Sequence, residues 1–278
     1  MYTFETPGRT TIVVRTGAGH VTVTAEATDL TTVELTPLNG PAEDAVAQAR
    51  VDQQGSSVVV DVPRHRAGLF RQGPSVGIAI TCPNGTVLQV KAAYSDVRAT
   101  GTFEQASVTT GSGDIDVEAV TGAAKLKTGS GTIFAGQVDE ALIATTGSGN
   151  ISVHQSGRSA TLNVGSGDIS IGELAGEVVA KAGSGDVEVG RLGGALLTKT
   201  GSGSLTVRRA ASGSVKATGA SGNISIGVEE GTVAWLDVST VSGRVSQELG
   251  ESDAPGEGQR RVEITARTVS GDLRVHRS

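Results

Sequence analysis

Hydrophobic and polar residues alternate along most of this chain in short stretches that end at glycine-rich turns. A period of two places every second side chain on one face of a β-strand. The apolar positions that follow the turns are Ile115/Val117, Ile133/Ala135, Ile151/Val153, Ile169/Ile171, Val187/Val189, Leu205/Val207 and Ile224/Ile226. The corresponding positions before the turns are Leu88/Val90, Ala106/Val108, Ala124/Leu126, Leu142/Ala144, Ala160/Leu162, Val178/Ala180, Leu196/Thr198, Val215/Ala217, Leu236/Val238 and Ile264/Ala266. The pattern predicts two strands per repeat, each with one buried face.

The turns recur at a constant spacing. Gly-Ser-Gly begins at residues 111, 129, 147, 165, 183 and 201, which gives five intervals of 18 residues, and degenerate copies follow at residues 220, 241 and 269. Side chains one repeat apart stack if each repeat forms one turn of a coil. We therefore predict an all-β fold, a right-handed parallel β-helix (β-solenoid) with about 18 residues per turn, its hand taken from the rule for parallel crossovers. A left-handed hexapeptide helix is rejected because the apolar columns do not recur with its shorter period.

The glycine turns have four possible uses. Stacked glycines supply positive φ and allow close backbone approach at a corner, and the Asp or Asn that follows hydrogen-bonds locally in turns. These residues are Asp114, Asn150, Asp168, Asp186, Asn223 and Asp272. Calcium-binding roll repeats space their glycine clusters more closely, and the column is broken here by Thr132, Ser204 and Arg244. A phosphate-binding loop would need a lysine and a following helix, and a dinucleotide-binding fingerprint would also need the helix. The structural interpretation is therefore favoured.

The two ends of the sequence are less regular. Residues 1–75 are predicted to form an N-terminal β-rich cap, with strands at 10–16, 20–27, 31–38 and 56–63 and one short helix within 40–55, where Pro41 and early acidic residues mark its start. Residues 76–278 are predicted to form the solenoid domain as one continuous unit. Residues 249–261 look like a polar loop, and no cap follows the last turn. An uncapped end exposes unpaired strand groups, so we expect the last turn to pack on a partner or on a second copy of the chain.

Composition and charge exclude several classes of function. The net charge of −6 argues against a nucleic-acid partner. Cys82 is the only cysteine, which rules out a disulfide framework, and it is expected to be buried. Neither a signal peptide nor an apolar run long enough to span a membrane is visible, so a cytoplasmic location is expected, with the cell surface as the alternative.

No catalytic centre, metal site or cofactor site is predicted. The histidines His20, His65, His154 and His276 are scattered, without the spacing of a metal site or of a nucleophile and its base. Polysaccharide-cleaving β-helices need clustered carboxylates on one face. The candidates here, Asp116, Glu118 and Glu188, are better explained as parts of a solvated surface.

Outward positions of the strand before each turn form a more informative pattern. Lys127, Lys181 and Lys199 fall in one column, which continues to Arg267. An adjacent column holds Ile143, Val179 and Leu197, and Phe134 points outward from the strand after the turn. These residues either reflect the preference of exposed strands for such side chains, or form a lateral binding strip with apolar anchors beside cations.

The segment "AITCPNGTVLQVKAAYSDVRATG", followed by "GSGDIDV" and "TGSGNISV", resembles the bacterial putative-adhesin β-strand-repeat family, also described as toast-rack domains. The resemblance is strong over residues 80–278, where Pro83, Gly85, Thr86 and Leu88 match the family's P-x-G-T-x-L motif. It implies a right-handed β-helical fold without catalytic residues, and a role in surface adhesion or in scaffolding within cell-envelope stress systems. The leading hypothesis is a non-enzymatic scaffold or protein-binding module with an unidentified protein partner. A cell-surface adhesin is the alternative, and a polysaccharide-active enzyme comes third.

Overall fold

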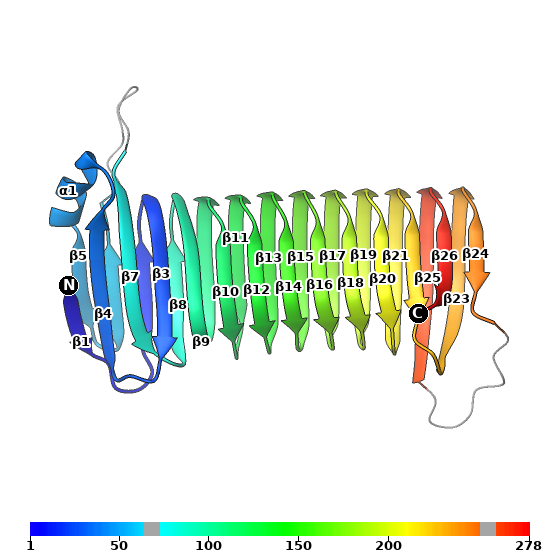
Figure 1. Ribbon diagram of the computed structural model, residues 1–278, viewed down its shortest axis with the longest axis horizontal. Coiled ribbons are helices and arrows are strands. Elements are labelled where there is room, and N and C mark those ends of the chain that lie inside the picture. The colour runs from blue at the N-terminus through cyan, green and yellow to red at the C-terminus, as the bar shows by residue number, and fades with distance from the viewer. Residues whose placement is uncertain (64–72, 251–259) are drawn as a thin grey trace. The chain divides into compact units, whose positions relative to one another are not determined.

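The computed structural model describes residues 1–63, 73–250 and 260–278 of the chain (Figure 1). The chain divides into two units, Met1–Asp139 and Glu140–Ser278. Each unit consists of stacked β-coils, and every coil contributes one strand before its glycine corner and one strand after it. The boundary predicted from the sequence, between residues 75 and 76, stays a prediction.

The regular part of the second unit follows the 18-residue repeat. The strands before the corners are β13 (Ala141–Ser148), β15 (Ser159–Ser166), β17 (Glu177–Ser184), β19 (Ala195–Ser202) and β21 (Gly213–Ser221). The strands after the corners are β14 (Ile151–Ser156), β16 (Ile169–Leu174), β18 (Val187–Leu192), β20 (Leu205–Ala210) and β22 (Ile224–Val228). Strands of one series pair in parallel with equivalent residues side by side, as Leu142 with Ala160 and Ile151 with Ile169. The extra residue of this repeat lies in the connection from β20 to β21, because Leu192 pairs with Ala210 at the usual spacing whereas Ala195 pairs with Ser214, one residue further on.

The first unit contains the same coils. They are formed by β8 (Thr86–Lys91), β9 (Tyr94–Ser112), β10 (Ile115–Val120), β11 (Ala124–Ser130) and β12 (Ile133–Val138). The long strand β9 takes part in two coils, because its first half pairs with β10 and its second half pairs with β8 and β11.

The apolar columns predicted from the sequence form the core of both units. Leu126, Leu162 and Leu196 are at most 1% exposed, and the other predicted inward aliphatics up to Ile226 are also buried. Large and small side chains alternate between neighbouring coils, as Leu142 lies beside Ala160 and Ala144 beside Leu162, which fills the interior without voids. The predicted all-β parallel solenoid with an 18-residue turn is therefore confirmed.

The N-terminal region of the first unit adds coils outside the sequence order. Strands β2 (Thr11–Arg15) and β3 (Ala18–Glu26) form a coil that pairs with β8 and β9 on one side. On the other side, β2 pairs with β6 (Ser57–Asp61) and β3 pairs with β7 (Ser75–Pro83). The first coil of the chain is thus inserted between strands that follow it in sequence, and Figure 1 shows β3 beside β7.

Short antiparallel strands and the helix close this region. Strand β4 (Leu30–Pro37) pairs antiparallel with β7 and with β1 (Tyr2–Glu5), and β5 (Arg50–Gln54) pairs antiparallel with β6. Helix α1 (Gly40–Ala47) has a proline in its first turn and packs against β4 and β7 through the buried Ala42 and Ala45. The predicted β-rich cap with one short helix is confirmed. The predicted helical extent was wrong, because residues 50–54 pair as a strand with β6 instead of extending the helix.

The last coils of the second unit are also out of order. Strands β25 (Arg260–Ser270) and β26 (Leu273–Arg277) pair with β21 and β22 on one side. On the other side they pair with β23 (Thr232–Ser242) and β24 (Val245–Glu248), which precede them in sequence. Figure 1 shows β25 and β26 in red between yellow and orange strands. The expectation that the last turn of the sequence ends the stack was therefore wrong: the end coil, as we call the coil of β23 and β24, does so.

Side-chain composition explains this order. Five inward residues of β25 and β26 are aliphatic and at most 1% exposed: Val262, Ile264, Ala266, Leu273 and Val275. The sixth, Thr268, is also buried, and its hydroxyl donates to backbone carbonyl oxygens. In the end coil, Gln247 occupies the inward position beside Val275. Burying the amide of Gln247 without partners would be costly, so the coil with Val275 at this position takes the inner place. The polar loop predicted at 249–261 lies largely outside the described residues, and Arg260 and Arg261 belong to β25.

Candidate functional site

The glycine corners are filled by backbone of the neighbouring coil. Gly167, the second glycine of its Gly-Ser-Gly, has φ of +130°, and a Cβ atom there would lie 2.3 Å from the carbonyl oxygen of Gly149. A side chain at this position is excluded both by the backbone conformation and by the contact. The corners are therefore built to let consecutive coils approach closely, and they leave no cradle for a phosphate.

The Asp and Asn residues after the glycines form a ladder of hydrogen bonds along the corner. The backbone N–H of Asp168 donates to Oδ1 of Asn150 at 2.9 Å, that of Asp186 donates to Oδ1 of Asp168 at 2.8 Å, and that of Ser204 donates to Oδ1 of Asp186 at 2.7 Å. We predicted local bonds within each turn, but the donor lies on the next coil. The side chain points along the stack and supplies an acceptor to that N–H group. Within the described ranges, no group of three or more His, Cys, Asp or Glu side chains is arranged to hold a metal ion.

A lateral face of the second unit carries most of the predicted binding strip. Val179 on β17 and Leu197 on β19 lie side by side in register, and both are half-buried. Two residues further along the same strands, Lys181 and Lys199 are also side by side and exposed. Ile143 on β13 is 46% exposed and belongs to the column of Val179, with a threonine between them on β15. The structure thus brings together two apolar residues and two cations on one sheet face.

The lysines of this face have no acidic partner. Among the described residues, no ion pair involves Lys181, Lys199 or Lys216, and Lys216 lies beside Leu197 on β21. Neighbouring strands are about 4.8 Å apart, and like charges directly across a strand pair repel each other. By contrast, Arg267 is paired with Asp237 at 3.0 Å. The lysine column is therefore an uncompensated cationic surface.

The two predicted strip residues of the first unit lie on different strands of the coil. Lys127 is exposed on β11. Phe134 on β12 is 41% exposed and lines a groove of about 450 Å³ with His20, Arg98 and Asp116. Because β11 precedes the corner and β12 follows it, Phe134 does not belong to the same sheet face as Lys127.

The carboxylates considered for catalysis are each engaged by a neighbour. Asp116 forms an ion pair with Arg98 at 3.0 Å, and Glu188 forms one with Arg208. Glu118 accepts a hydrogen bond from a backbone N–H at 2.7 Å. These contacts account for the three side chains as parts of the solvated surface.

The remaining reactive residues are dispersed. His20 and His154 are exposed, His276 is half-buried, and His65 lies outside the described residues. Cys82 is fully buried in β7, as predicted, and burial raises the pKa of its thiol to about 11. A thiol with this pKa stays protonated and unreactive at neutral pH.

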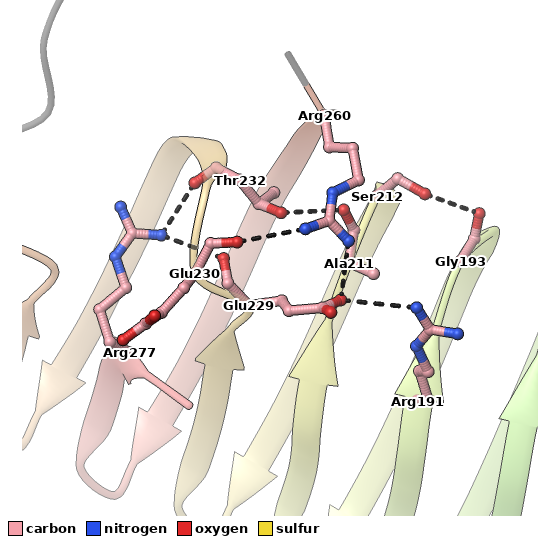
Figure 2. Close-up of polar contacts among 9 residues, drawn as sticks. All are labelled: Arg191, Gly193, Ala211, Ser212, Glu229, Glu230, Thr232, Arg260 and Arg277. Atoms are coloured by element: carbon pink, nitrogen blue, oxygen red, sulfur yellow. Dashed lines mark hydrogen bonds and ion pairs between the residues drawn. The ribbon is translucent and has the colours of Figure 1, made fainter.

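An arginine cluster at the last coils was missed by the sequence analysis. Figure 2 shows the Glu229 carboxylate between the guanidinium groups of Arg260 at 3.1 Å and Arg191 at 3.7 Å. Arg277 donates to the carbonyl oxygens of Thr232 at 2.9 Å and Glu229 at 3.3 Å. These contacts hold the connection from β22 to β23 where it crosses the inserted coil. Strand alternation gives no sign of such contacts, since the residues lie at strand ends and in the connection.

The exposed Trp235 was also missed. It is 67% exposed on β23 and lines a groove of about 440 Å³ with Gly213, Arg261 and Glu263. The inward assignment of Leu236 already implied that Trp235 points outward, so alternation could have identified it.

Solved structures and one protein family are similar to this chain. No helix among the described residues has the length and apolar character needed to cross a membrane. No curated protein matches the chain. The similar solved structures include a "putative adhesin" from Bacteroides fragilis NCTC 9343, with 13% identity and a TM-score of 0.36, which covers 98% of this chain and 95% of that chain. They also include a "putative cell adhesion protein" from Clostridium sporogenes ATCC 15579, with 10% identity and a TM-score of 0.22, which covers 98% of this chain and 94% of that chain.

The resemblance recognised in the sequence is confirmed by a family model. The model described as Toastrack DUF4097 matches residues 9–277, which covers nearly the whole chain. The chain therefore belongs to the Toastrack DUF4097 family.

Proposed function

We propose that the protein is a non-catalytic binding module that holds an acidic surface of a protein partner against the lateral face of β17 and β19. The observation that carries this proposal is the unpaired lysine pair, Lys181 and Lys199, in register beside the half-exposed Val179 and Leu197. Membership in the Toastrack DUF4097 family supports a surface or binding module in general.

The chemistry of the face fits such a partner. Unpaired cations attract carboxylates and raise the rate of encounter. Aliphatic side chains between them lose water on contact and can anchor the complex. A sheet face held by hydrogen bonds on both sides is already ordered, so binding requires little further loss of conformational freedom.

Cell-surface adhesion is the alternative function, and a cytoplasmic location belongs to the leading proposal. Fractionation of native cells separates the two. Recovery of the protein in the cytosolic fraction contradicts adhesion, whereas protease-sensitive protein on intact cells contradicts a cytoplasmic scaffold. Polysaccharide cleavage is not proposed, because the three candidate carboxylates are engaged by neighbouring groups.

A partner capture with face variants tests the proposal. The test variant changes Ile143, Val179 and Leu197 to Asp, and the matched control changes Ser152, Ser170 and Thr206, which point outward on the strands after the corners, to Asp. We expect a partner captured by the wild type and the control to be lost from the test variant, and its binding to weaken as salt is raised. Equal capture by the test variant and the control contradicts the proposal.

A further inference from the structure

The end coil has strand pairing on one side only. Within the described chain, β23 pairs with β25 and β24 pairs with β26, and neither has a neighbour on its other side. Every second backbone N–H and C=O of such an edge lacks a strand partner. Both strands of the end coil therefore have an unpaired edge, and the two edges lie at the same end of the stack of coils.

The core is open at the same place. In the neighbouring coil, Ile264 and Leu273 are fully buried. The residues beside them in the end coil are exposed: Leu236 is partly exposed and Val245 is 40% exposed. Apolar surface therefore lies between the two open strands, where a further coil would cover it.

Charge does not protect this edge. Asp237 is paired with Arg267 at 3.0 Å, and Glu248 is paired with Arg274 at 2.7 Å, so both acidic groups are compensated by the inner coil. Strand β23 spans 11 residues and contains no lysine and no proline. Natural edge strands are usually short, charged or bulged to prevent pairing, whereas β23 is long, pairs with β25 without a bulge, and has a single charged residue, Asp237, which is paired with Arg267.

We propose that the end coil is a dimerisation surface, occupied by the end coil of a second copy of this chain around a two-fold axis. A half-turn about an axis perpendicular to the stacking direction places the edge strands of two copies antiparallel, whether β23 meets β23 or β24. Antiparallel pairing satisfies the open backbone groups, and a symmetric contact uses the same patch on both copies.

A second copy fits better than a single strand from another protein. A peptide strand would cover β23 or β24 and leave the apolar surface between them exposed. A second end coil offers two strands at the matching separation and its own Leu236, Val238 and Val245 to cover the core. The pairing of Asp237 and Glu248 within each copy lowers the repulsion between identical surfaces.

Sedimentation equilibrium of the full chain, from about 1 to 100 μM as expected for a specific contact of this kind, tests the proposal. The edge variant changes Val245 and Gln247 to Lys, which places like charges at the symmetric contact. The control changes Ser170 and Ser225 to Lys, both pointing outward on strands after the corners. We expect the wild type to form a dimer and the control to dimerise with the same dissociation constant. In the edge variant, the dissociation constant of the dimer should be at least about tenfold higher.

Hydrogen exchange of the wild type at low and high concentration provides a readout that does not depend on any variant. The amides of 232–248 are expected to become protected as the protein concentration rises. A wild type that stays monomeric, an edge variant that dimerises like the control, or protection of these amides that does not change with concentration would each overturn the proposal. The last result would show that the chain's own residues or a tightly bound strand cover the edge.

Discussion

The outermost strands of the N-terminal region of the first unit differ in length and pairing from those of the end coil of the second unit. In the first unit the outermost strands, β1 and β5, have four and five residues and pair antiparallel with their neighbours. Helix α1 additionally packs on β4 and β7. In the second unit the outermost strand, β23, has 11 residues and continues the parallel register of the coils.

This difference shows which strand features prevent a further coil from pairing with the end of a solenoid. Short antiparallel strands such as β1 and β5 break the parallel register that a further coil would need. In the end coil, β23 has 11 residues and both strands keep the parallel register, although β24 has only four residues. Leu236, Val238 and Val245 keep the inward aliphatic positions, and Gln247 is the polar exception. The end coil therefore remains a template for one more coil.

The two regions agree in one respect. Each places the coil nearest its chain terminus between two other coils: β2 and β3 lie between β6/β7 and β8/β9, and β25 and β26 lie between β21/β22 and β23/β24. A terminal coil held on both sides cannot fray from the end, and the outer coil is connected to the chain at both of its ends. Each of these two coils is thus stabilised by strand pairing on both of its sides.

Deletion of residues 260–278 is expected to have the largest effect on this comparison. It removes Val262, Ile264, Leu273 and Val275, whose burial contributes roughly 6–12 kcal/mol, and it separates β23 and β24 from β21 and β22. Hydrogen exchange should show loss of protection throughout 232–248. Deletion of residues 1–5, which removes only the edge strand β1, should leave the rest of the first unit protected. Retained protection of 232–248 after the first deletion would contradict the inserted order.

Core truncations should distinguish the interior from the open edge. Leu162→Ala should cost about 3 kcal/mol in the free energy of unfolding, because Leu162 is fully buried between two coils. Leu236→Ala should cost about 1 kcal/mol in dilute protein, since its side chain remains partly in water. Urea unfolding measures both values. Equal costs in the monomer would show that the end coil is covered.

Substitutions in the ladder of hydrogen bonds at the corners should have smaller effects on the free energy of unfolding than the core truncations. Asp186→Ala removes the acceptor of the Ser204 N–H and should cost about 1–2 kcal/mol. Asp186→Asn keeps an acceptor and should be nearly neutral, as Asn150 already serves this role. Arg244 is the last residue of the ladder, and it contributes only its backbone N–H, which Arg244→Ala retains. This substitution should therefore change the free energy of unfolding by less than about 0.5 kcal/mol. Urea unfolding of the three variants checks this order, and a neutral Asp186→Ala would contradict a role for the ladder.

Cys82, which is buried on β7 in the N-terminal region of the first unit, allows a test by pH. Burial raises the pKa of its thiol from 9.0 to about 11, so the folded state holds its proton where the unfolded state loses it. The stability that Cys82 contributes should be complete below pH 9.0 and should decline as the pH rises toward 11. The difference in urea midpoint between the wild type and Cys82→Ala, followed across this range, measures the effect. Rapid labelling of the native thiol at pH 8 would instead show that this region opens readily.

Much of the fold could be predicted because the constant spacing of the Gly-Ser-Gly turns determines which residues of neighbouring coils pair. Positions such as Leu126, Leu162 and Leu196 recur with inward alternation, and all are buried as predicted. The order of the outer coils could not be predicted in this way. The alternation of Leu236 and Ile264 assigns both to one column without saying which lies nearer to Val215. That choice depends on the difference between Gln247 and Val275 at one inward position.

The candidate site was only partly accessible from the sequence. Outward alternation found Val179, Leu197, Lys181 and Lys199, which share one sheet face. It also assigned Phe134 to the strand after the turn, but alternation alone did not show that this strand belongs to a different sheet face. Contacts such as those of Glu229 and Arg260 also escaped it, because they join coils brought together by the inserted order.

Disulfide formation between paired cysteines tests the inserted order most directly. In a Cys82→Ala background, Lys216 and Thr265, which lie side by side on β21 and β25, are changed to Cys, and in a second variant Lys216 and Asp237 are changed. Neighbouring strands are about 4.8 Å apart and next-nearest strands about 10 Å, while a disulfide requires Cα atoms within about 7 Å. We predict rapid intramolecular crosslinking of 216 with 265 and none of 216 with 237. The opposite result would show that the coils stack in sequence order and would contradict this account.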